Sequence, residues 1–89
     1  LTRRAAWGID QGVPLKNLSM HVSMAKLAAS EAAVAVSNRC LQVFGGYGFI
    51  DEYPMGKYLR DARVLTLYEG TSQIQKLIIG RELTGLNAM

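Results

Sequence analysis

The longest regular pattern in this 89-residue chain covers residues 15–43. Apolar side chains recur there every three or four positions, which is the repeat of one helical face. The main line consists of Leu15, Leu18, Val22, Ala25, Ala29, Ala32, Val36, Cys40 and Val43, and a second line beside it consists of Met20, Met24, Leu27, Val34 and Leu41. The pattern therefore predicts a helix roughly 40 Å long, at about 1.5 Å per residue, whose wide apolar arc must be covered from two sides.

Proline and glycine divide the remaining sequence into shorter helical segments. Gly12 and Pro14 interrupt the first segment, and Pro54 suits the first position of a later helix. The sequence predicts an all-α helical bundle and a single domain over residues 1–89, with helices at about 1–11, 15–43, 55–62 and 71–84. Helices this short leave the arc of the long helix partly bare, so we expect the chain to associate with further copies.

Composition excludes several classes of function. The net charge of +3 is modest and the basic residues are scattered, whereas nucleic-acid binding usually needs a clustered basic face. No apolar run reaches the roughly 18 residues of a membrane span. Cys40, the single cysteine, is expected to be a small buried apolar side chain, and His21, the single histidine, a surface or packing residue. We expect no metal site.

One acid, Glu69, lies between an apolar segment and a helix start. Gly70 permits a sharp change of backbone direction, Thr71 or Ser72 can cap the following helix, and Ser72 with Gln75 has the spacing of a capping box. The helix N-terminus favours the charged carboxylate, whereas apolar burial favours the neutral acid. A carboxylate under both influences suits a general base. A solvated acid at a helix start is the alternative.

A glycine-rich stretch follows the long helix. Gly45, Gly46 and Gly48 lie within four positions, where bare peptide groups can approach a ligand. The stretch lacks a preceding strand and the GxGxxG spacing, so a dinucleotide-binding fold is not indicated. A helix C-cap followed by a turn is the alternative interpretation.

Three blocks carry a resemblance to a known family. They are Gln42-Val43-Phe44-Gly45-Gly46, then Tyr58-Leu59-Arg60-Asp61-Ala62-Arg63, then Tyr68-Glu69-Gly70-Thr71-Ser72-Gln73-Ile74-Gln75. In this order and spacing they resemble the C-terminal helical domain of FAD-dependent acyl-CoA dehydrogenases, over essentially the whole chain. Members of that family are several times longer. We therefore expect this chain to be a fragment that is inactive alone.

The resemblance implies a role for each matched position. Glu69 would be the base that removes the α-proton of the thioester while the β-hydrogen passes as hydride to FAD, giving a trans-2-enoyl-CoA. The backbone N–H of Glu69 and a ribityl hydroxyl of FAD would hold the thioester oxygen. Tyr68 and Gly70 would contact the substrate. The positions expected to bind FAD are Thr71, Ser72 and Gln73, together with Gln42, Val43, Phe44, Gly45 and Gly46, which would reach FAD bound mainly to a neighbouring subunit.

Partners and location follow from the same resemblance. It implies an acyl-CoA substrate, an electron-transfer flavoprotein as oxidant, a homodimer or homotetramer, and a mitochondrial matrix or prokaryotic cytoplasmic location. The alanine-rich run at residues 25–35 is most similar to short-chain or bacterial generalist members, and an acid at position 69 argues against isovaleryl-type and long-chain-type members. A small helical oligomerisation or interaction module without flavin remains the alternative function.

Overall fold

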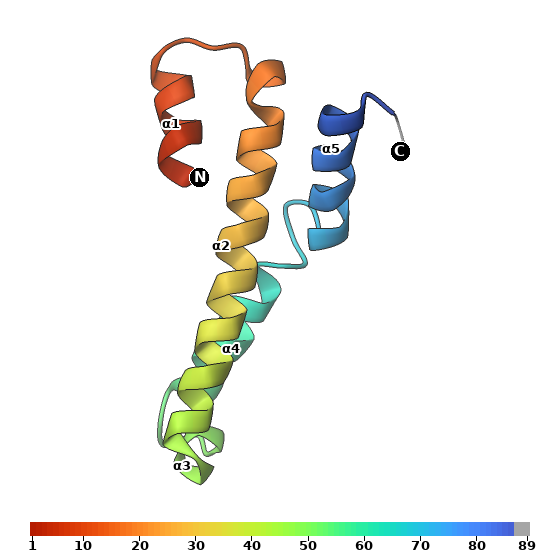
Figure 1. Ribbon diagram of the computed structural model, residues 1–89. Helices are drawn as coiled ribbons and strands as arrows, with labels where there is room; N and C mark the ends of the chain where they lie inside the picture. Colours follow the sequence, from red (N-terminus) through yellow and green to blue (C-terminus); the bar gives the residue numbers. More distant parts are fainter. Residues whose placement is uncertain (87–89) are drawn as a thin grey trace.

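The computed structural model describes residues 1–86, which form helices and no strand. The elements are α1 (Thr2–Asp10), α2 (Leu15–Phe44), α3 (Gly46–Phe49), α4 (Met55–Val64) and α5 (Ser72–Thr84). Figure 1 shows α2 as the long axis of the molecule, with α1 beside its N-terminal half, α5 on its other side, and α3 at its far end. The all-α fold class is confirmed. No helix within residues 1–86 is both long and apolar enough to cross a membrane.

Helix α2 packs against every other helix in the described residues. Its second apolar line, which includes Leu27, Val34 and Leu41, is half-buried, and Ser23 and Ser30 are buried close to that line. The hydroxyl of Ser30 donates to the carbonyl oxygens of Lys26 and Leu27 at 2.7 and 3.2 Å. These serines are small and the Ser30 hydroxyl is bonded within its own helix, so burial leaves no unpaired polar atom at that position.

The main apolar line of α2 is only half covered. Its N-terminal part contacts α1, where a Cβ added at Gly8 would come within 2.5 Å of Cδ2 of Leu18, so the glycine allows the close approach. Towards the C-terminus Val36 is 58% exposed and Val43 87% exposed. Cys40 lies on this uncovered part and is exposed. The expectation that Cys40 is buried was wrong for this chain, because α4 and α5 pack on the second line instead.

The glycine-rich stretch contains one turn of helix, α3, which the sequence reading did not predict. Gly45 ends α2 with φ +63°, and the chain continues directly into α3. Gly48 is buried, and a Cβ there would lie 2.7 Å from the carbonyl oxygen of Leu41. Tyr53 packs its ring against Phe44 and Tyr47, at centroid distances of 6.1 and 5.6 Å. The glycines therefore let α3 fold back tightly onto the end of α2.

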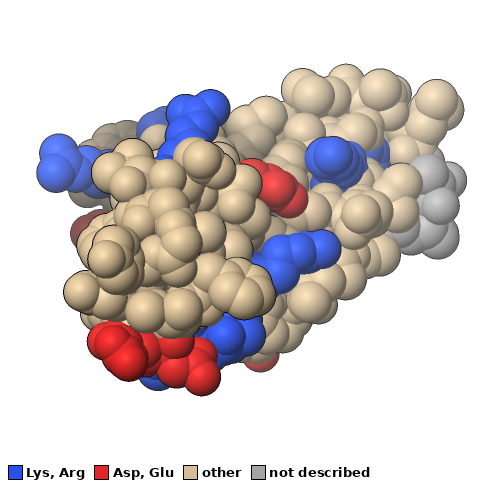
Figure 2. Space-filling model, turned by 90° about the horizontal axis from the view of Figure 1, so that it is seen from below, with Lys and Arg blue, Asp and Glu red and all other residues tan. Residues whose placement is uncertain are grey.

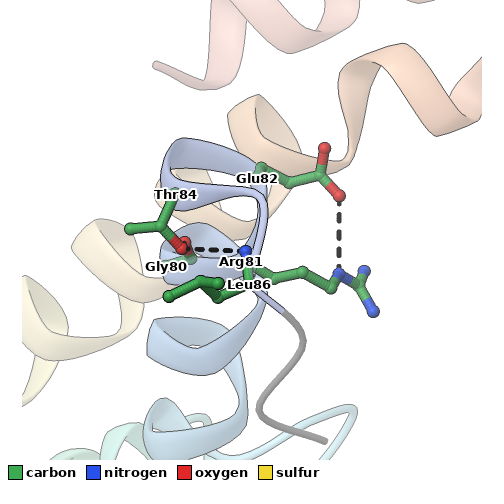
Figure 3. A network of polar contacts seen from close by, with 5 residues as sticks. All are labelled: Gly80, Arg81, Glu82, Thr84 and Leu86. Carbon is green, nitrogen blue, oxygen red and sulfur yellow. Dashed lines mark hydrogen bonds and ion pairs between the residues drawn. The ribbon is translucent and has the colours of Figure 1, made fainter.

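Polar contacts end helix α5 (Figure 3). The hydroxyl of Thr84 donates to the carbonyl oxygen of Gly80 at 2.7 Å and accepts from the backbone N–H of Leu86 at 3.2 Å, and Arg81 pairs with Glu82 at 3.6 Å. Gly85 follows in the left-handed conformation, with φ +74°, which is the usual glycine C-cap. The helix end predicted at about residue 84 is thus explained by local hydrogen bonds.

The surface shows no continuous basic face in the view of Figure 2, where Lys and Arg side chains lie apart and alternate with Asp and Glu. Most of this face is uncharged. No group of three or more His, Cys, Asp or Glu side chains among the described residues is arranged to hold a metal ion.

We predict that the 89-residue chain self-associates through the uncovered line of α2. Val36 and Val43 are exposed, so covering them with a second copy would remove apolar surface from water. No large side chain among residues 1–86 is completely buried within one chain. Sedimentation velocity at micromolar concentration should show dimers or larger species, and Val36→Lys with Val43→Lys should shift them towards monomer. Asn38→Lys, an exposed change on the same helix, is the matched control. A well-folded monomeric wild-type chain would contradict the prediction.

Candidate active site

Glu69 lies in the connection between α4 and α5, in an unusual backbone conformation. Its φ is +54°, and it is the only residue other than glycine with positive φ among the described residues. Gly70 follows with φ +87°. We call this pair of left-handed residues the 69–70 turn. The left-handed conformation costs a residue with a Cβ about 1–2 kcal/mol, so other contacts must hold it. Such strain is typical of functional positions.

Thr71 caps α5, and the predicted capping box of Ser72 and Gln75 does not form. Oγ1 of Thr71 accepts the backbone N–H of Ile74 at 3.2 Å, and the extended backbone of Thr71 fits the N-cap position. Ser72 is already inside the helix, and its hydroxyl donates to Oε1 of Glu31 on α2 at 2.6 Å. Of the two hydroxyls expected as caps, that of Thr71 caps the helix and that of Ser72 ties it to α2.

Side chains from two helices hold the 69–70 turn. Nζ of Lys26, on α2, donates to the carbonyl oxygen of Gly70 at 2.8 Å. The side-chain amide of Gln75, which is buried, donates to the carbonyl oxygens of Glu69 and Gly70, both at 3.4 Å. The turn is thereby bonded to both α2 and α5.

The segment before the turn is also fixed. The backbone N–H of Ser72 donates to the carbonyl oxygen of the buried Thr66 at 3.1 Å, which closes residues 66–72 into a loop. The hydroxyl of Thr66 donates to the carbonyl oxygen of Arg63 at 2.8 Å and accepts from Nη1 of Arg63. The C-terminal end of α4 and the start of α5 therefore set both ends of the loop.

Glu69 borders a cavity of about 320 Å³ between α2 and this loop, lined by Lys26, Ala29, Ser30, Leu65, Tyr68 and Glu69. Most of the lining is apolar. Glu69 itself is exposed in this chain. The expected shielding of the carboxylate is thus only partly present: the described residues supply one apolar wall and leave the other side open. Tyr68, expected to contact substrate, lies in that wall.

A second, polar cavity of about 270 Å³ adjoins the start of α5 and is lined by Glu31, Val34, Arg63, Thr66, Leu67, Ser72 and Gln73. It brings together Ser72 and Gln73, two of the predicted cofactor-binding residues. Gln73 is exposed, whereas Ser72 is buried and bonded to Glu31. Of these two side chains, Gln73 is the better placed to reach a molecule in this cavity.

The other predicted cofactor-binding residues lie at the far end of α2. Gln42 is 16 positions after Lys26 in the same helix, which at 1.5 Å per residue separates them by roughly 24 Å. Gln42, Val43, Phe44, Gly45 and Gly46 are all exposed, and nothing lies within 4 Å of a Cβ added at Gly45 or Gly46. Within one chain, this stretch is therefore a separate surface from the Glu69 cavity.

Sequence reasoning did not identify Lys26, Glu31 or Arg63 as residues of the site. Lys26 and Glu31 lie more than 40 positions before the residues they bond, so only the folded helix brings them together. The signal in the sequence was weak: charged residues interrupt the apolar arc of α2. Arg63 appeared only within a block that carries the family resemblance, without a role of its own.

Comparison with known proteins gives consistent matches. Residues 1–84 match the family described as "Acyl-CoA dehydrogenase, C-terminal domain". The chain is 49% identical to the mitochondrial short-chain specific acyl-CoA dehydrogenase of Rattus norvegicus and 47% identical to that of Homo sapiens, in each case over 93% of this chain and 19% of the relative. It is 45% identical to cyclohexane-1-carbonyl-CoA dehydrogenase of Geobacter metallireducens, over 93% of this chain and 21% of the relative.

A solved structure agrees with these matches. It concerns the electron transferring flavoprotein of Acidaminococcus fermentans and a mechanism of flavin-based electron bifurcation, and one of its chains superposes with a TM-score of 0.85 at 36% identity. The superposition covers 92% of this chain and 21% of that one. This chain thus spans about a fifth of the length of the proteins it matches.

Proposed function

Because this chain belongs to the acyl-CoA dehydrogenase family, we propose that it forms the C-terminal part of an enzyme that oxidises acyl-CoA thioesters to trans-2-enoyl-CoA. The observation that most supports the proposal is that Glu69 lies in a left-handed turn at the edge of a cavity with apolar walls. A single carboxylate in that position can remove one proton from a substrate carbon. A chain that spans about a fifth of its relatives is proposed to be inactive alone.

The residues of this chain would act on the α-carbon of the thioester. The acyl chain would lie along the apolar wall formed by Ala29, Leu65 and Tyr68, with Gly70 close to the substrate. The carboxylate of Glu69 takes the α-proton, and the backbone N–H of Glu69 donates to the thioester oxygen as negative charge develops on it. FAD, when bound, would supply the acceptor for the β-hydrogen, which leaves as hydride. No second acid is required, because the two hydrogens leave to different acceptors.

The donor set fits a flavin dinucleotide. The polar cavity at the start of α5 offers the amide of Gln73 and the guanidinium of Arg63, which suit the polar edge of a flavin or a phosphate. Thr71 and Ser72 hold that segment in place through the bonds described above. At the far end of α2, the open peptide groups of Gly45 and Gly46 suit close contact with a cofactor, which we assign to a neighbouring subunit.

We propose partners on the same basis. The uncovered line of α2 supports a homodimer or homotetramer. An electron-transfer flavoprotein is the proposed oxidant, and the similar solved structure, which concerns such a flavoprotein, supports that choice. We propose the mitochondrial matrix for a eukaryotic protein and the cytoplasm for a prokaryotic one. The rat and human relatives are named as mitochondrial, which supports a mitochondrial location in the eukaryotic case.

The test of this proposal uses the full-length protein that carries these residues. We expect it to purify with bound flavin, and anaerobic addition of butyryl-CoA should bleach the flavin and yield the corresponding enoyl-CoA by mass spectrometry. A flavin-containing protein that no acyl-CoA, short or long, can reduce would contradict the proposal. A protein that binds no FAD would favour the second candidate, a helical assembly module, which the uncovered face of α2 also supports.

A further inference from the structure

We propose that Lys26 is a positioning residue for Glu69, and that its bond to Gly70 sets the direction in which the carboxylate points. This inference rests on the proposed function of Glu69 as the base. It concerns a residue on α2, 43 positions before Glu69, outside the loop that carries the acid.

The hydrogen bond from Lys26 to the carbonyl oxygen of Gly70 is short and carries a charge. Nζ of Lys26 lies 2.8 Å from the carbonyl oxygen of Gly70, whereas the two bonds from Gln75 to the same turn are 3.4 Å long. A hydrogen bond from an ammonium group is stronger than one between neutral groups. Lys26 is half-buried, so water competes less for the Gly70 carbonyl than it would at an exposed site. Among these three bonds, the one from Lys26 is the shortest and the only charged one.

The turn requires such a restraint. Glu69 at φ +54° is in a conformation that a residue with a Cβ leaves readily unless its surroundings fix it. The Gly70 carbonyl belongs to the peptide group immediately after the turn. Holding that carbonyl against the 30-residue helix α2 fixes the Gly70–Thr71 peptide plane. Together with the bond from Gln75 to the Glu69 carbonyl, it restrains the backbone on the C-terminal side of Glu69 and so the direction of its side chain.

Lys26 also lines the cavity that Glu69 borders. Its stem forms part of the wall while its ammonium group reaches the turn, which is how lysine commonly places a charge beside an apolar surface. A methionine of similar length can fill the same wall without donating a hydrogen bond. Replacement by methionine therefore separates the positioning bond from the packing.

The experiment compares four variants of the full-length flavin-loaded protein. In Lys26→Met we expect kcat to fall about 10- to 100-fold, since a displacement of about 1 Å can cost about 10²-fold in rate. We expect KM for acyl-CoA, the flavin content and Tm to stay near wild type. Lys26→Arg, which keeps a charged donor, should recover most of kcat. Lys16→Met makes the same chemical change at an exposed position of α2 and should match wild type. Glu69→Gln tests whether Glu69 is the base.

Each result decides one question. A Lys26→Met enzyme with wild-type kcat, beside an inactive Glu69→Gln enzyme, would overturn the positioning role and leave the proposed function intact. A lower flavin content and a lower Tm in both Lys26 variants would also overturn the positioning role, because Lys26 would then act only on stability. A Lys26→Arg enzyme no faster than Lys26→Met would overturn it too, because the charged donor would then not matter. Full activity in Glu69→Gln would instead remove the proposed function.

Discussion

The Gly70→Ala variant of the full-length protein is expected to reduce its flavin about 100-fold more slowly than wild type, and to unfold at a lower denaturant concentration. Two features of the 69–70 turn give this result. Gly70 has φ +87°, where alanine is strained by about 1–2 kcal/mol. A Cβ there would also lie 2.5 Å from Nε2 of Gln75, so the amide that bonds the turn must move. A shifted turn misplaces the carboxylate of Glu69, and about 1 Å of misplacement can cost about 10²-fold.

Gly80→Ala is the matched control for that variant. Gly80 is inside α5, has no positive φ, and has nothing within 4 Å of an added Cβ. Alanine there should leave the rate unchanged and raise helix stability by about 0.5–1 kcal/mol. Equal rates for Gly70→Ala and wild type, measured with equal flavin content, would show that the turn does not position the acid.

Glu69→Gln is expected to lower steady-state turnover about 10²- to 10⁴-fold, which is the usual contribution of a general base. Glutamine has nearly the same size as glutamate and can keep the same backbone conformation, but its amide cannot accept the α-proton. Substrate binding and flavin content should therefore change little. Turnover is measured with an artificial electron acceptor, and Glu52→Gln, a change at an exposed acid in the loop before α4, is the control. Loss of activity in the control variant as well would point to an effect of charge in general.

The fold was predictable where local signals are strong. The three- and four-residue repeat of α2, the break at Gly12 and Pro14, and the glycine after α5 are each set by neighbouring residues. The faces of α2 were not predictable in this way. Ser23 and Ser30 are buried while Val36 and Val43 remain exposed. The apolar pattern marks surface that is suited to burial, and the described residues of one chain cover only part of it.

The candidate site was also predictable only in part. The position of Glu69 between an apolar segment and a helix start could be predicted from the sequence. Gly70 permits the turn and Thr71 caps the helix, and both effects depend only on neighbouring residues. The partners Lys26 and Glu31 could not, since they reach the loop only after α2 packs beside it. The role of Gln75 changed for a related reason: with Thr71 as the cap, its amide bonds the turn carbonyls instead of a capping box.

The central claim is that the Glu69 carboxylate removes the substrate α-proton. It is tested most directly by the rate of flavin bleaching in a single anaerobic turnover, which isolates the reductive step from reoxidation. Mixed with saturating acyl-CoA in a stopped-flow instrument, flavin-matched Glu69→Gln should bleach at least about 100-fold more slowly than wild type. Bleaching at the wild-type rate would contradict the account.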